Sequence, residues 1–259
     1  MIMRQGDMKW FVKEDSIVRE IWGKADTILF IFAGASAEFA VNKSVDWLYF
    51  TGKLPADPLG RLFSTVSYAR RIVFSEYDAA LKAIDQITAV HKEVETKRGA
   101  KIPDWAYRDV LFMLIDYSIR SFELLERALT AEEKGEIFEV FYQVGARMGI
   151  GGLPETYHSW LQMRARQLNE NFVKSNFSID LYKQYKKHLG LPRYVMLREV
   201  QLKLAPRQVR QLLGLGSWSA LEVILPAYKF TRVLHLHKLV RDLILPEKYK
   251  LEIAGLDAH

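Results

Sequence analysis

The chain of 259 residues contains no cysteine. This absence excludes disulfides, thiolate-ligated haem, cysteine-ligated iron–sulfur clusters and cysteine zinc sites. Any metal centre must therefore take its ligands from His, Asp, Glu, Tyr or Met side chains. A chain without thiols also fits a reducing compartment.

The sequence also lacks a long apolar run. The most apolar early stretch, "TILFIFAGASAEFAV" at residues 27–41, is shorter than the roughly 20 residues that a spanning helix needs, and Glu38 interrupts it. We interpret it as a buried core helix. The N-terminal "MIMRQGDMKWFVKEDS" has no apolar segment typical of a secretory signal. We therefore expect a cytoplasmic protein.

The excess of one charge sign is small. Lys and Arg total 37 and Asp and Glu total 31, which gives a net charge of +6 and a pI near 9.3. Such a charge permits loose contact with nucleic acid or an anionic membrane and establishes neither. We expect no nucleic-acid partner. A hydrophobic content of 49% with 26% charged residues is ordinary for a globular protein.

No long run alternates with the period of two that a half-buried strand requires, whereas apolar residues recur at helical spacing almost throughout. The fold class predicted is all-α, with one helical domain over residues 25–245, an N-terminal segment at 1–24 and a C-terminal tail at 246–259. Breaks rich in Pro and Gly separate the expected helices. These lie at about 25–50, 58–74, 76–98, 104–128, 130–148, 154–173, 178–188, 193–203, 206–213 and 227–241.

His91 is the most informative of the six histidines. It follows an apolar stripe at steps of three and four in "EYDAALKAIDQITAVHKEVE", formed by Ala80, Ile84, Ile87 and Val94. The spacing predicts that its ring faces the interior. One interpretation is a core histidine that is hydrogen-bonded to a neighbouring group. The other is an axial ligand to haem iron.

Arg61 and Thr65 are four residues apart in the preceding helix and therefore share a face. The arginine fork suits a carboxylate, either one of the protein or one of a cofactor such as a haem propionate. A threonine in a helix often bonds back to the carbonyl four residues earlier. The pair thus has a structural and a cofactor-binding interpretation.

Two further histidine patterns do not predict a metal site. Glu155 and His158 have the Glu-x-x-His spacing of di-iron bundles, but no other histidine has a glutamate three residues before it. We interpret this motif as a helix start. His235 and His237 point about 200° apart on a helix. Their basic surroundings are typical of a solvated face or of a membrane-surface contact.

Asp116 lies in the apolar run "VLFMLIDYSI", which suggests a buried acid, yet Arg120 follows four residues later. Glu123 and Arg127 repeat this spacing. The pattern predicts a ladder of surface ion pairs. We see no nucleophile elbow and no Ser/His/Asp signature, so no catalytic residue can be named from these motifs.

The order of several motifs resembles one family. "DPLGRLFST" is followed by "AVHKEV", "IPDWAYRDVLFMLI", "LTAEE" and "LGLPRYVMLREVQLKLAPRQVRQLLGL". The sequence resembles, over roughly residues 25–245, the family of the latex-clearing protein (rubber oxygenase) and of the membrane-bound oxygenase of mycophenolic acid biosynthesis. The most specific elements are Asp57, Pro58, Arg61, Thr65 and His91 with their spacing.

The resemblance implies a helical fold with a globin-like core and a b-type haem whose iron is bound by His91. It places Arg61 and Thr65 where they support the haem or its ligand helix. We expect the second ring nitrogen of His91 to donate to an acceptor that fixes the ring. The activity implied is that of an oxidoreductase, with dioxygen as co-substrate and an apolar or isoprenoid-like alkene as substrate.

The sequence departs from that pattern at the iron site. Ser64 stands where rubber oxygenase has a lysine, and Thr88 and Glu95 stand where it has arginines. Two other classes of function therefore stay open. One is a non-catalytic helical protein that kept the fold without haem. The other is a peripheral protein that binds lipids or membranes through residues 227–245.

Overall fold

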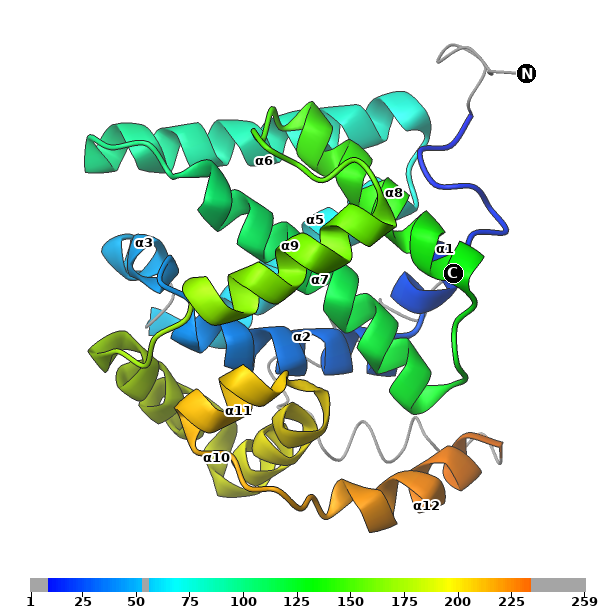
Figure 1. Ribbon diagram of the computed structural model, residues 1–259, viewed down its shortest axis with the longest axis vertical. Helices are drawn as coiled ribbons and strands as arrows, with labels where there is room; N and C mark the ends of the chain where they lie inside the picture. The colour runs from blue at the N-terminus through cyan, green and yellow to red at the C-terminus, as the bar shows by residue number, and fades with distance from the viewer. Residues whose placement is uncertain (1–8, 53–55, 234–259) are drawn as a thin grey trace.

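The computed structural model describes residues 9–52 and 56–233, and these form an all-α fold. Two isolated bridges, Trp10 with Glu76 and Asn42 with Phe172, are the extended pairing found within these ranges. The predicted fold class is confirmed, while the globin-like core stays a prediction. The helices are α1 (Ile17–Trp22), α2 (Ala25–Val41), α3 (Val45–Phe50), α5 (Pro58–Val73), α6 (Tyr77–Arg98), α7 (Asp104–Leu125), α8 (Ala131–Arg147), α9 (Tyr157–Glu170), α10 (Asn176–Leu204), α11 (Arg207–Leu213) and α12 (Leu221–Val233) (Figure 1).

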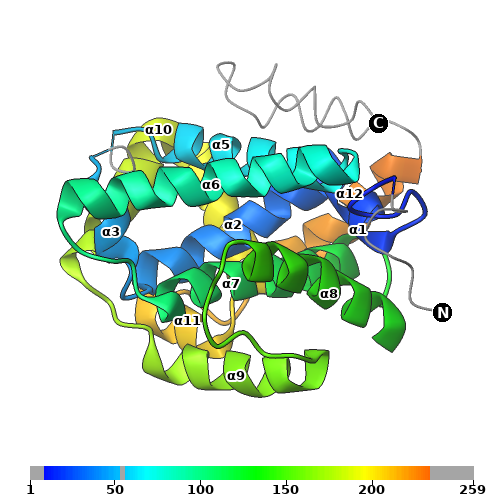
Figure 2. The same cartoon turned by 90° about the horizontal axis from the view of Figure 1, so that it is seen from above.

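Helix α2 runs through the middle of the molecule, with α5 and α6 on one side and α8 and α9 on the other (Figure 2). Because it is surrounded by other helices, it is apolar on nearly all faces, and Ile28 and Ile31 are fully buried. Helix α7 crosses it closely at Gly34. A Cβ atom at that position would lie 2.4 Å from the Tyr117 ring, so the crossing requires glycine.

Helix α1 was not predicted, because six residues are too few for a helical period to be recognised. Ser16 caps its first turn by accepting a hydrogen bond from the Val18 amide at 3.1 Å. Ile21 and Trp22 are fully buried in the main core. Part of the predicted N-terminal segment 1–24 therefore packs into the same core as α2 and α8.

Two breaks in the helices can be compared with the sequence prediction. The expected helix 25–50 breaks after Val41, because the Asn42 side chain accepts from the backbone and hydroxyl of Ser44 at 2.7 and 2.5 Å. The expected break between helices 178–188 and 193–203 is present as a kink inside α10, where the backbone leaves the helical conformation at Gly190 with φ +71°. This left-handed conformation is one that glycine adopts without strain.

None of the described helices combines the length and the apolarity that a membrane span requires. Residues 227–233 of the predicted helix 227–241 lie in α12, which begins at Leu221, and residues 234–241 lie outside the described residues.

Candidate functional site

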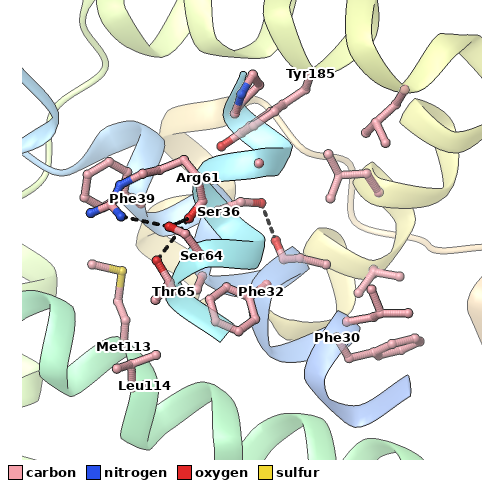
Figure 3. Close-up of a pocket in the computed structure, with 18 of the residues that line it drawn as sticks. Phe30, Phe32, Ser36, Phe39, Arg61, Ser64, Thr65, Met113, Leu114 and Tyr185 are labelled. Atoms are coloured by element: carbon pink, nitrogen blue, oxygen red, sulfur yellow. Dashed lines mark hydrogen bonds between the residues drawn. The ribbon is translucent and has the colours of Figure 1, made fainter. Parts of the chain in front are cut away.

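The site is an apolar cavity of about 1170 Å³. Its walls come mainly from α2, α5, α6, α7, α10 and α12. Phe30, Phe32 and Phe39 from α2 and Met113 and Leu114 from α7 line it (Figure 3). Ligand sites commonly enclose about 300–1,000 Å³. This cavity is therefore large enough for a large cofactor or an extended apolar ligand.

Helix α5 contributes three polar side chains to the cavity, and its start is held by an N-cap. Asp57 caps it by accepting from the Gly60 amide at 3.0 Å, and Pro58 occupies the first helical position. The first turns then present Arg61, Ser64 and Thr65 to the cavity (Figure 3).

Arg61 is a partly buried cation with which no carboxylate of the described residues pairs. Its Nη1 atom donates to Ser64 Oγ at 3.1 Å, and within residues 9–52 and 56–233 no carboxylate forms an ion pair with it. Burial lowers the pKa of Arg61, and Tyr68 opposes this effect. A guanidinium in such surroundings favours a bound anion, since its fork matches a carboxylate.

Thr65 bonds back to its own helix, which is the structural interpretation of this threonine. Its hydroxyl donates to the Arg61 carbonyl at 3.2 Å, and the Ser64 hydroxyl donates to the same oxygen at 2.9 Å. Thr65 lines the cavity, but its proton is engaged within α5. It can therefore support the turn that carries Arg61.

His91 lies on α6 and lines the same cavity as Arg61 and Thr65. Its Nδ1 atom is enclosed by protein and has no hydrogen-bond partner among the described residues, so the hydrogen bond that we expected to fix the ring is not formed there. Burial and, to a smaller extent, the charge of Arg61 lower the pKa of His91 to about 4, while Glu95 opposes both effects. The imidazole is therefore neutral at pH 7 and offers a lone pair.

Tyr107 on α7 packs against the His91 ring. The ring centroids are 5.1 Å apart and the planes meet at 70°. The Tyr107 hydroxyl donates to Glu95 Oε1 at 3.2 Å, which also accepts from the Ile102 amide at 2.9 Å. Burial and Glu95 raise the pKa of Tyr107. Tyr107 was not singled out from the sequence, because a contact between two helices leaves no local pattern.

The other described metal candidate, Glu155 with His158, does not form a metal site. Among the described residues no group of three His, Asp or Glu side chains is arranged to hold a metal. Glu155 and His158 lie at the start of α9, where Thr156 and Ser159 form the cap, as predicted. His235 and His237 lie outside the described residues, as does most of the predicted membrane-contact region.

The predicted surface ladder at Asp116 is wrong. Arg120 does contact Asp116 at 2.7 Å, but Asp116 is only 8% exposed. Burial favours the neutral acid, yet Arg164 and Arg120 outweigh this and lower the pKa of Asp116. The second rung does not form either, since Glu123 pairs with Lys134 at 2.8 Å.

Arg164 on α9 is the centre of a buried network that the sequence did not reveal. Its Nη2 atom donates to Glu38 Oε2 at 2.6 Å and to Asp116 Oδ2 at 2.8 Å. Tyr117 donates to the same Glu38 oxygen at 3.0 Å. The available signal was Glu38 itself, a carboxylate inside an apolar run that needs a buried partner.

The chain matches a model of a known protein family. The family described as "ER-bound oxygenase mpaB/B'/Rubber oxygenase, catalytic domain" matches residues 25–237. The chain belongs to this family. The match confirms the resemblance and identifies the helical domain as an oxygenase-type catalytic domain. No curated protein and no solved structure matches the chain significantly.

Proposed function

We propose that this chain is a b-type haem-dependent oxygenase that acts with dioxygen on an apolar or isoprenoid-like alkene. One observation carries the proposal. His91 and Arg61 line one large apolar cavity. The His91 ring is neutral and its Nδ1 atom has no hydrogen-bond partner among the described residues, and no described carboxylate pairs with Arg61. An iron porphyrin has the complementary groups, namely a metal, carboxylates and an apolar ring.

The residues present fit this cofactor. We assign the iron to Nε2 of His91, because Nδ1 is enclosed by protein. Arg61 would hold a propionate with its fork. Thr65 would hold the first turns of α5 in place through its bond to the Arg61 carbonyl.

Bound haem supplies the iron at which dioxygen is activated for cleavage of a carbon–carbon double bond. The protein contributes the surroundings of that reaction. Phe30, Phe32 and Leu114 exclude water and bind an alkene by burial of apolar area. Ser64 offers only a hydroxyl already bonded to Arg61, so no strong protein ligand is expected from that position.

A visible spectrum tests the cofactor. Wild-type protein from haem-replete cells should show a Soret band, and His91→Ala should abolish it without loss of helical content. Arg61→Ala should weaken haem retention less, because one propionate contact is only part of the binding. His158→Ala is the matched control, since His158 is exposed on α9. A colourless wild-type protein would instead favour the non-catalytic interpretation.

Oxygen uptake tests the reaction. With an isoprenoid test alkene, the haem-loaded protein should consume dioxygen and form carbonyl products, and His91→Ala should do neither. Haem binding without oxygen uptake on any alkene would contradict the oxygenase activity while leaving the cofactor site intact. Liposome co-sedimentation of the haem-free protein separates the lipid-binding alternative.

A further inference from the structure

The His91 ring lacks the usual device that fixes a ligating histidine. Such a histidine ordinarily donates its second ring N–H to a carboxylate, a carbonyl or a water, and this bond sets the ring orientation. Here Nδ1 has no hydrogen-bond partner among the described residues. The orientation of the ring must therefore depend on packing.

Tyr107 supplies that packing from another helix. Its ring lies 5.1 Å from the His91 ring in a tilted arrangement of 70°, the edge-to-face geometry that aromatic rings prefer. His91 belongs to α6 and Tyr107 to α7, and both line the cavity. The contact restricts how far the imidazole can turn about its side-chain bonds.

Glu95 holds Tyr107 in turn. It follows His91 by one helical turn on α6, and its Oε1 atom accepts from the Tyr107 hydroxyl and from the Ile102 amide at 3.2 and 2.9 Å. The second bond fixes the connection between α6 and α7. One carboxylate oxygen thus sets the position of Tyr107 relative to the helix that carries His91.

We propose that Tyr107, anchored by Glu95, is a positioning residue that fixes the orientation of the His91 ring in the cavity. The inference rests on the proposed function only in assigning iron to that ring. The orientation itself is a property of the protein without haem and can be measured there.

The first experiment is nuclear magnetic resonance on haem-free protein with ¹³C- and ¹⁵N-labelled histidine. The chain has six histidines, and the His91 signals are those lost in His91→Ala. In Tyr107→Leu they should shift towards the other histidine signals and broaden, because the ring current and the packing are lost. Tyr107→Phe should keep most of the wild-type chemical shift of the His91 signals. Glu95→Gln should keep both their shift and their line width, since the amide oxygen of glutamine still accepts from the Tyr107 hydroxyl.

Tyr49→Leu is the matched control. Tyr49 is also a partly buried tyrosine whose hydroxyl donates to a carboxylate, that of Asp180 at 3.0 Å, but it does not line the cavity. The Tyr49→Leu substitution should leave the His91 signals unchanged. Should Tyr107→Leu not fold, as judged by circular dichroism, Glu95→Ala provides the same test by releasing the hydroxyl. The His91 signals should then broaden while the Tyr107 ring is still present.

The second experiment is a haem titration of the same variants. Loss of groups that orient a metal ligand typically costs 10–100-fold in affinity. We therefore expect Tyr107→Leu to weaken haem binding at least about 10-fold, with Glu95→Gln and Tyr49→Leu close to wild type. His91 signals unchanged in both Tyr107→Leu and Glu95→Ala would overturn the positioning role. Changed signals without haem binding by any form, wild type included, would uphold that role and contradict the proposed function.

Discussion

Asp109 on α7 is a carboxylate that is only 2% exposed. It accepts hydrogen bonds from the side-chain amides of Asn42 at 2.8 Å and Asn171 at 2.9 Å. Burial nevertheless raises the pKa of Asp109 to about 6, against those two bonds. At the scale of the single residue, the interior thus holds an acid that titrates well above its usual range.

This raised pKa predicts a pH dependence of stability. The pKa of Asp109 is 3.8 in the unfolded chain and about 6 in the native state, so between pH 3.8 and 6 the native state binds more protons there than the unfolded chain does. Its contribution to the free energy of unfolding is therefore full below pH 3.8 and falls as the pH rises through 6. Relative to Asp109→Asn, the wild type should lose on the order of 2 kcal/mol between pH 4 and 7 in urea unfolding.

Asp85 provides the control of opposite sign. It is exposed, and its hydrogen bonds with Arg147 lower its pKa. The difference between wild type and Asp85→Asn should therefore move, if at all, in favour of the wild type as the pH rises. A difference between wild type and Asp109→Asn that is flat over pH 4–7 would show that Asp109 titrates normally.

At the scale of the helices, Arg164 joins α9 to α2 and α7 through Glu38 and Asp116. Arg164→Met would leave two carboxylates buried without their shared cation. We expect a loss of roughly 3–5 kcal/mol in the free energy of unfolding, because removing one partner of a buried ion pair exposes its desolvation cost. Guanidinium unfolding followed by circular dichroism measures it.

Arg147→Met is the matched control for Arg164→Met. Arg147 also pairs with a carboxylate, Asp85 at 2.7 Å, but both side chains are nearly half exposed. Such surface pairs contribute about 0–1 kcal/mol. Equal losses from the two substitutions would mean that the Arg164 network is not buried as described.

Two glycines in helices should respond oppositely to alanine. At Gly34 a Cβ atom would meet the Tyr117 ring at 2.4 Å, so Gly34→Ala should separate α2 from α7 and cost roughly 1–3 kcal/mol. At Gly135 on α8 nothing lies within 4 Å of such an atom. Gly135→Ala should therefore stabilise by roughly 0.5–1 kcal/mol through helix propensity. Thermal unfolding midpoints that shift in the same direction for both would contradict the close crossing at Gly34.

At the scale of the whole molecule, the folded unit extends beyond the family match. The match begins at residue 25, yet α1 before it buries Ile17, Val18, Ile21 and Trp22 in the main core. Each such side chain contributes about 1.5–3 kcal/mol on burial. Their sum is comparable with the whole stability of a typical domain, about 5–15 kcal/mol.

A chain shortened to residues 25–259 should therefore unfold far below the melting temperature of the full chain or fail to fold. Circular dichroism melting of the two forms is the measurement. A chain that begins at residue 9 keeps α1 and serves as the control. An unchanged melting temperature for the 25–259 form would show that α1 is dispensable.

The sequence by itself determined the helical class, most helix positions and three of the residues that line the cavity, Arg61, Thr65 and His91. These depend on local properties: the 3.6-residue period, caps such as Asp57-Pro58 and the spacing of Arg61, Thr65 and His91. Those signals lie within one helix and can be read from it.

Only the tertiary structure decided which groups have partners. Among the described residues, no carboxylate pairs with Arg61 and no acceptor binds Nδ1 of His91, whereas Asp116 is buried against Arg164. Each of these facts depends on residues from other helices. Asp116 shows the reason most clearly. Its spacing to Arg120 is the same on a surface and in a core, and only the packing of α9 against α7 removes the water that distinguishes the two.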